Sequence, residues 1–302
     1  MPLFYRSDSK GSQVNKANAK AAYAARMNRV LEYIQWHLDE DLSVDALSEV
    51  ACFSRFHFQR QFAEFVGVSV ARYVQLLKLR RASYALAFDQ ARRITDIALE
   101  AGFGNAESFS RAFKKALGQT PSGFRTRPEW QAWNERMPVP NNKRTHPMKV
   151  EIVDFPEMQV AVFEHHGSPN TLMTSVQKFI AWRKESACSP VATSKTLGIP
   201  YSDPEQTPES DFRFDICGEV SAPVPENAHG VINKTIPAGR CAVVRHIGST
   251  DRIADSIHPL FRDWLPGSGE ELRDFPLFFH YIERVPQVEE HRQVTDIYLP
   301  LK

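Results

Sequence analysis

The sequence predicts two domains: an all-α domain with two helix-turn-helix units, followed by an α+β domain made of a duplicated β-α-β-β unit. Three observations predict this fold class. The first half repeats itself at a spacing of 51 residues, the second half repeats a different pattern at a spacing of 81, and the net charge changes sign between the halves. With 302 residues, the chain is long enough for two domains that each bury a hydrophobic core.

Composition divides the chain into four segments. Residues 1–23 are polar and lack the apolar run of a signal peptide, so we expect a disordered leader there. The all-α domain takes residues 24–127. Residues 128–147 contain four prolines and two tryptophans, and we expect a linker that is partly helical near the tryptophans. The α+β domain takes residues 148–302.

The two halves also differ in charge. Residues 1–145 carry 22 Lys and Arg against 14 Asp and Glu, whereas residues 146–302 carry 15 against 22. A basic surface attracts a polyanion and an acidic surface repels it. A nucleic-acid partner is therefore expected for the first half only.

The repeat in the first half joins residues 54–67 to residues 105–118. The matching positions are Phe58 and Phe109, Arg60 and Arg111, Phe62 and Phe113, and Gly67 and Gly118. Two copies indicate duplication of a functional unit, because a solenoid needs at least three repeats to be stable.

Each copy is predicted to fold as helix, turn, helix. In the first copy a short helix over residues 43–50 leads through a turn to Ser54, whose hydroxyl we expect to cap the next helix. In the second copy a helix over residues 94–101 leads through a glycine-containing turn to Asn105. An ordinary helical bundle would show the same apolar stripes of phenylalanine. The duplication, with an outward arginine in both copies, favours the DNA-binding motif, whose second helix lies in the major groove.

The stretch IALEAGFGNAESFSRAFKKALGQTPSGFR, residues 97–125, resembles the C-terminal signature of the AraC/XylS transcription regulators almost position by position. The resemblance extends over about residues 26–127. It implies a DNA-binding transcription regulator that works with RNA polymerase. It also implies that a helix over residues 69–88 links two reading helices, which enter major-groove segments about 34 Å apart. By the same resemblance, the positions that contact DNA are Phe56, Gln59, Arg60, Ser110 and Arg111.

The outward side chains of the two second helices are the candidates for reading bases, because arginine, glutamine and asparagine form paired hydrogen bonds with base edges. The predicted base contacts are Arg55, Phe56, Gln59, Arg60, Asn105, Glu107, Ser110 and Arg111. The predicted phosphate contacts are Arg72, Arg81, Lys114, Lys115 and Arg125. The second reading helix is less basic, so we expect it to contribute less base readout.

The repeat in the second half predicts strand, helix, strand, strand in each copy. Matching positions include Pro156 and Pro237, Ala161 and Ala242, His165 and His246, Gly167 and Gly248, and Asp215 and Asp296. A duplicated unit of this kind implies two sheets or half-sheets related by a pseudo-twofold axis. The cleft where they meet is a common place for a ligand.

The segments PAGRCAVVRHIGS (residues 237–249) and VTDIYLPL (residues 294–301) resemble the GyrI-like effector-binding domain. The resemblance implies a small organic effector in the central cleft, often held by a carboxylate two residues before a tyrosine. That tyrosine is Tyr281, and Phe279 stands at the carboxylate position, so we expect a neutral, flat or aromatic effector. The predicted cleft residues are Trp182, Tyr201, Trp264, Phe279, Tyr281 and Glu283.

The sequence shows few signs of disulfides, membrane spans, metal sites or catalysis. The four cysteines have no paired spacing and fit a reducing cytoplasm, and no apolar run approaches the ~20 residues of a membrane span. We expect no metal or cofactor, and structural roles for His165 and His246, because no ligand set surrounds them.

We predict a regulator without enzymatic activity. The alternatives are a GyrI-like hydrolase fused to a DNA-binding module, or a drug-sequestering binder whose DNA contact is incidental.

Overall fold

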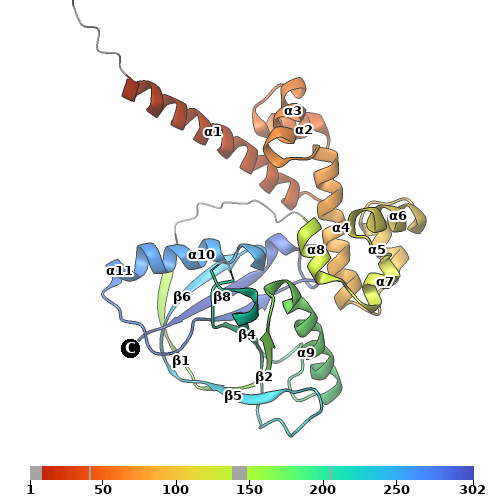
Figure 1. Ribbon diagram of the computed structural model, residues 1–302. Coiled ribbons are helices and arrows are strands. Elements are labelled where there is room, and N and C mark those ends of the chain that lie inside the picture. Colours follow the sequence, from red (N-terminus) through yellow and green to blue (C-terminus); the bar gives the residue numbers. More distant parts are fainter. Residues whose placement is uncertain (1–8, 41, 138–147, 205) are drawn as a thin grey trace, which may run out of the picture. The chain divides into compact units, whose positions relative to one another are not determined.

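The computed structural model describes residues 9–40, 42–137, 148–204 and 206–302 (Figure 1). The described residues form two compact units, the first ending at Lys78 and the second beginning at Leu79. The boundary falls inside the long helix α4 (Val70–Phe88), so the second unit contains the second helix-turn-helix copy together with the whole α+β domain.

The first unit is helical. It contains α1 (Ser9–Trp36), α2 (Val44–Ala51), α3 (Arg55–Val66) and the first part of α4. Phe58 and Phe62 of α3 are fully buried in a core that also contains Leu47 of α2 and Tyr73 of α4. The repeated phenylalanines therefore hold the reading helix against the rest of its unit, as their spacing predicted.

Two local expectations need correction. Helix α1 begins at Ser9, so residues 9–23, which we expected in a disordered leader, are helical; the alanines in this stretch are the strongest helix formers. Ser43 caps α2 by accepting from the Ala46 amide at 3.2 Å, but the Ser54 hydroxyl makes no such bond at the start of α3.

The second unit begins with the rest of α4 and four shorter helices. These are α5 (Ile94–Glu100), α6 (Ala106–Leu117), α7 (Pro121–Thr126) and α8 (Trp130–Arg136). The expected linker thus contributes a packed helix, because Trp130 and Trp133 of α8 are buried beside Tyr84 of α4. Residues 138–147 lie outside the described residues.

The α+β domain is built on one eight-stranded antiparallel sheet in the order β1-β6-β8-β7-β3-β4-β2-β5. The strands are β1 (Val150–Phe155), β2 (Met158–His166), β3 (Thr196–Pro200), β4 (Arg213–Glu219), β5 (Ile232–Ile236), β6 (Gly239–Ile247), β7 (Phe278–Glu283) and β8 (Val294–Pro300). Short turns of helix precede some elements, among them η1 (Pro169–Thr171), η3 (Thr250–Arg252) and η5 (Glu290–Arg292).

The strands form repeat pairs: β1 with β5, β2 with β6, β3 with β7, and β4 with β8. Partners lie at equal distances from the centre of the sheet, which is the pseudo-twofold relation that the sequence predicted. Each copy contains the expected β-α-β-β unit and one further strand before it. That first strand pairs with the other copy, β1 with β6 and β5 with β2. The two copies therefore form one continuous sheet instead of two, joined at the centre by β3 and β7.

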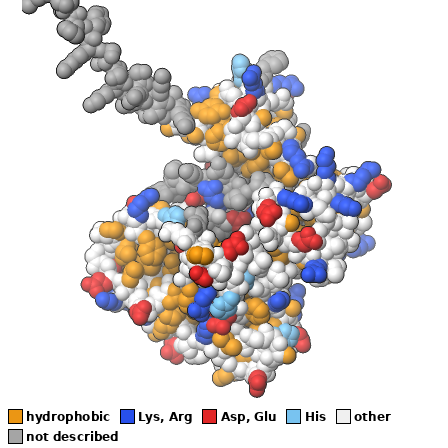
Figure 2. Space-filling view, in the orientation of Figure 1, with side chains coloured by type: hydrophobic (Ala, Val, Ile, Leu, Met, Phe, Trp, Pro, Cys, Tyr) orange, Lys and Arg blue, Asp and Glu red, His pale blue; other side chains and the backbone are white. Residues whose placement is uncertain are grey.

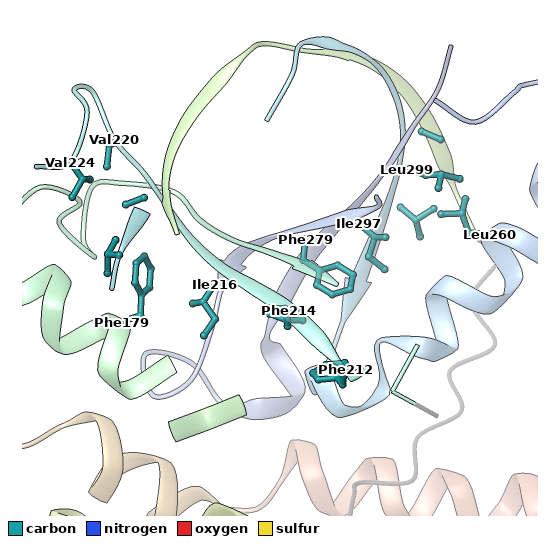
Figure 3. Close-up of a cluster of buried hydrophobic side chains, with 14 of the residues drawn as sticks. Phe179, Phe212, Phe214, Ile216, Val220, Val224, Leu260, Phe279, Ile297 and Leu299 are labelled. Carbon is teal, nitrogen blue, oxygen red and sulfur yellow. The ribbon is translucent and has the colours of Figure 1, made fainter. Parts of the chain in front are cut away.

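Helices cover one face of this sheet. Phe179 and Trp182 of α9 (Leu172–Ser186) belong to the same hydrophobic cluster as Leu260, which directly follows α10 (Ala254–Pro259). Figure 3 shows this cluster between the sheet and the helices, with Phe214, Phe279 and Ile297 at its middle. A separate cluster of strand residues, including Val160, Ile199 and Phe278, fills the opposite face.

Gly198 pairs directly with Phe279 where the two copies meet, and the two positions are 81 residues apart. A Cβ atom at position 198 would lie 2.6 Å from Phe214 Cζ and 2.8 Å from the Tyr281 hydroxyl oxygen. A glycine is required here because aromatic side chains occupy the space above it.

We therefore predict that Gly198→Ala lowers the free energy of unfolding by about 1–3 kcal/mol, the usual cost of overpacking a core. Gly267→Ala is the matched control, because nothing lies within 4 Å of a Cβ at that position. Its effect should stay within about 0.5 kcal/mol. Urea unfolding of both variants measures the difference, and equal stabilities would refute the close contact over Gly198.

Candidate nucleic-acid interface and effector site

Helix α3 presents the side chains predicted to read bases in the first unit. Arg55, Gln59 and Arg60 are all exposed. The Arg55 guanidinium lies 3.3 Å from the Asp45 carboxylate of α2, with both side chains more than half exposed. The side chain of Phe56 lies outside the described residues.

Helix α6 presents the corresponding side chains in the second unit, but three of them already have partners. The Asn105 side-chain oxygen accepts from the Ser108 amide at 2.8 Å and so caps the helix. Glu107 lies 3.3 Å from Arg111 one turn later, in an exposed ion pair. Ser110 is half-buried. This helix therefore offers fewer unengaged groups than α3, in line with the weaker readout expected for it.

The five predicted phosphate contacts differ in their surroundings. Lys114 and Lys115 are exposed at the end of α6, and Figure 2 shows Lys and Arg side chains gathered over α5 to α7. Arg72 is half-buried and donates to Gln75 at 2.7 Å. Arg81 donates to Glu289 at 2.9 Å, and Arg125 donates to the Arg92 carbonyl at 2.7 Å. These last two arginines are engaged within the protein, which the sequence could not indicate because their partners are distant along the chain.

The helix-covered face of the sheet carries an aromatic cluster, which we define as Phe212, Phe214, Phe279 and Tyr281. The ring of Phe279 lies 6.4 Å from that of Phe214 and 6.2 Å from that of Tyr281. Phe279 is only 5% exposed. Burial also raises the pKa of Tyr281 well above its usual range, so its hydroxyl stays protonated.

The structure brings four of the six predicted effector residues together. Trp182 belongs to the same hydrophobic cluster as Phe279, and Trp264 and Tyr281 pack against it. Tyr201 lies on the opposite face, because it donates to Asp215 there. A register shift between Tyr281 and Glu283 breaks the strand alternation, and Glu283 is exposed. Tyr201 and Glu283 are therefore corrections to the predicted set.

The opposite face carries a lysine cluster, which we define as Lys234, Glu164, Asp215 and Tyr201. The Lys234 ammonium donates to Glu164 at 2.7 Å and to Asp215 at 2.6 Å. Burial and the Asp215 bond raise the pKa of Tyr201 to about 12, whereas the Lys234 bond lowers the pKa of Glu164. This cluster was not predictable from the sequence, because Lys234 reaches it only through strand β5, which pairs with β2 of the other copy.

The other copy places a matching ion pair on the same face. Arg245 donates two bonds to Asp296, at 2.7 and 2.8 Å, where Asp296 is the repeat partner of Asp215. Buried aspartates at both equivalent positions are thus neutralised by basic side chains, from the adjacent strand β6 for Asp296 and from β5, two strands away, for Asp215, as burial of a charge requires.

The two repeated histidines join turns to helices. His165 bonds to the Ser175 hydroxyl at 2.9 Å and the Ser168 carbonyl at 3.1 Å, and His246 bonds to Ser256 and Ser249 in the same way. A carbonyl can only accept, so Nε2 carries the proton and Nδ1 accepts from the serine. Burial lowers the pKa of both histidines, which favours this neutral form.

The described ranges contain no group of three or more His, Cys, Asp or Glu side chains that could hold a metal ion. Within these same ranges no helix is both long and apolar enough to span a bilayer.

Comparison with known proteins agrees with this architecture. Residues 148–302 match the family described as the GyrI-like small molecule binding domain, and residues 47–127 match a helix-turn-helix domain. The chain is 47% identical to the probable transcriptional regulator YgiV of Escherichia coli over 154 residues, which are 51% of this chain and 96% of that protein. It is 37% identical to the right origin-binding protein of Escherichia coli over 118 residues, which are 39% of this chain and 40% of that protein.

Among solved structures, the EcmrR–DNA complex aligns with a TM-score of 0.44 at 15% identity, covering 84% of each chain. The family match spans half of the chain, and the helix-turn-helix match supplies the DNA-binding half. The chain therefore belongs to the GyrI-like small-molecule binding family, and its N-terminal half makes it a DNA-binding transcription regulator of the AraC/XylS type.

Proposed function

We propose that this regulator reads DNA with the exposed faces of α3 and α6, and that its effector is a neutral aromatic molecule bound at the aromatic cluster. The observation that carries the effector class is Phe279, a buried phenylalanine at the centre of the helix-covered face. The proposed action on transcription requires RNA polymerase as a further partner. Because the protein must reach DNA, we place it in the cytoplasm.

The DNA proposal rests on the duplicated reading helices. Arg60 and Arg111 hold equivalent positions in the repeat and are both exposed. Exposed ion pairs such as Glu107 with Arg111 contribute at most about 1 kcal/mol, so DNA can replace Glu107 as the partner of Arg111 at little cost. Lys114 and Lys115 supply the phosphate contacts of the second unit in this proposal, and Arg72 supplies one in the first.

The effector proposal rests on where the carboxylates lie. Successive side chains of a strand point to opposite faces, and Asp215 alternates with Phe214 and Ile216 of the aromatic face. Glu164 and Asp215 are both engaged with Lys234 on the other face. A cation placed among Phe214, Phe279 and Ile297 would lose its hydration without gaining an opposite charge. A neutral aromatic ligand would gain ring contacts there instead.

The same geometry weighs against a hydrolase. Glu164 and Asp215 converge on one point, but the Lys234 ammonium lies between them and bonds to both. A general acid needs a raised pKa at neutral pH, and the pKa of Glu164 is lowered by its bond to Lys234. We therefore propose a regulator without enzymatic activity. A drug-sequestering binder would share the effector site but would not bind DNA in a sequence-specific way.

We predict that Arg60→Ala weakens binding to an operator selected from random DNA by about 1–3 kcal/mol, the usual value of a bidentate arginine–guanine contact. Binding to unrelated DNA should change far less. Arg93→Ala is the control, because Arg93 is also exposed but lies before α5, outside both reading helices. Fluorescence anisotropy at fixed salt measures both variants. Equal losses on operator and unrelated DNA would show that Arg60 contacts only phosphate.

We predict that triphenylphosphine oxide, a neutral aromatic, stabilises the protein more than tetraphenylphosphonium, a cation of similar shape. A ligand at about 100 times its dissociation constant adds about 2.7 kcal/mol, which for a domain of this size raises the melting temperature by roughly 5–10 °C. Phe279→Ala should reduce the shift caused by the neutral probe. A larger shift with the cation, unchanged in Phe279→Ala, would overturn the proposed effector class.

A further inference from the structure

Arg80 of α4 is a buried arginine whose carboxylate partners belong to the α+β domain. Its side chain is 1% exposed. Nε and Nη2 each donate to Glu290 at 2.7 Å, and Nη2 also donates to Asp251 at 2.5 Å. Glu290 lies in η5 and Asp251 in η3. We call Arg80, Asp251 and Glu290 the arginine clamp.

Aromatic side chains enclose the clamp from the helical side. The guanidinium carbon of Arg80 lies 4.4 Å from the Trp133 ring centroid, and Nη2 donates to the Tyr84 hydroxyl at 3.3 Å. From the other side, the Ser249 hydroxyl donates to Glu290 at 2.6 Å. The clamp therefore has a fixed geometry in which each charged group is oriented by at least one neighbour.

Burial acts on both charged ends of the clamp, and it raises the pKa of Asp251. Burial lowers the pKa of Arg80, but the carboxylate of Glu290 and the other neighbours more than offset this, and the pKa lies well above its ordinary value. Removing one partner of a buried ion pair leaves an uncompensated charge, which is much more costly than losing a surface pair. The contact is thus a buried attachment that is costly to break.

Further contacts join the same two parts of the second unit. Arg81 donates to Glu289, Trp130 donates to Gln177 of α9 at 3.1 Å, and Asn134 donates to the Asn170 carbonyl at 3.2 Å. The helices that carry the second reading unit are therefore attached to the effector domain at several points, with the clamp as the buried one.

The two carboxylates of the clamp lie next to strands that lead to the aromatic cluster. Asp251 follows β6 and Glu290 precedes β8, and β6 and β8 are neighbours in the sheet. Ile297 of β8 pairs with Phe279 across the strands. A ligand that moves Phe279 thus acts on β8, the strand that begins shortly after Glu290.

From this geometry we infer that Arg80 is a positioning residue that holds the second reading unit on the effector domain, so that a ligand at the aromatic cluster acts on DNA through α6 and not through α3. The first reading unit lies outside the compact unit that contains the clamp. This inference rests on the proposed effector site for its ligand response, whereas the attachment itself does not require a ligand.

Hydrogen exchange of the full chain tests the attachment. In the Asp251→Asn/Glu290→Gln double variant, amides of α5 to α7 should exchange about tenfold faster or more, corresponding to about 1.4 kcal/mol. The amides of α2 and α3 and of the central strands should keep their rates. Glu289→Gln is the matched control, since it removes one half-exposed partner of Arg81 and should leave all three regions unchanged.

Two outcomes would overturn the attachment: unchanged exchange in α5 to α7, or a uniform increase over the whole second unit. If the double variant fails to fold, the single variant Asp251→Asn, which retains the Glu290 bonds, replaces it in the exchange experiment. It should show a smaller acceleration confined to the same helices, and a uniform acceleration in it would equally refute the positioning role.

Footprinting tests the ligand response. On a selected operator, triphenylphosphine oxide should change the protection of the half-site contacted by α6 in the wild-type protein, and should have no effect on protection by the folded clamp variant. An equal change at both half-sites, or an unchanged response in the variant, would overturn the inference. If the probe fails to bind the wild-type protein, the proposed effector class fails, while the exchange experiment still decides the role of Arg80.

Discussion

The pairing of β3 with β7 is the constraint on which the effector domain depends. It joins the two copies of the repeat into one sheet, and the exchange of β1 and β5 closes each copy onto the other. Gly198 pairs with Phe279 across this junction, and aromatic side chains of both copies, Phe214 and Tyr281, occupy the space above the glycine. The two copies share one fold, but they place different residues, Gly198 and Phe279, at the centre of the sheet. That centre is apolar.

Buried charge organises the rest of the second unit. The two sheet aspartates are neutralised on the face away from the helices, Asp215 by Lys234 and Asp296 by Arg245. This arrangement leaves the helix-covered face to aromatic side chains. Arg80 is neutralised by carboxylates of the effector domain, and this ion pair ties α4, which leads to the second reading unit, to the α+β domain. Charge pairing therefore accounts both for the proposed ligand class and for the proposed route of regulation.

The internal repeats, local periodicity and the family resemblances were enough to predict the helix-turn-helix copies and the fold class. Phe58 and Phe109 mark buried faces through their spacing alone, and Phe279 and Tyr281 follow from strand alternation and the resemblance. Features that depend on contacts between distant residues were not predictable. The sequence does not show that Lys234 reaches Asp215 through an exchanged strand, or that Arg80 meets Glu290, 210 residues later. Tyr201 was assigned to the wrong face because the strand alternation around it was not known.

We propose that the small-molecule site and DNA binding are coupled within one chain. Reciprocal linkage between the two binding reactions tests this coupling most directly. The affinity of the full-length protein for a selected operator is measured without and with a saturating ligand found by thermal shift, and the affinity for that ligand is measured without and with operator. Coupled sites must change each other's affinity by the same factor, typically about 5–150-fold. We expect the affinity for operator and the affinity for ligand to change by the same factor, and this factor to differ from one. An operator affinity that stays the same at saturating ligand would contradict it.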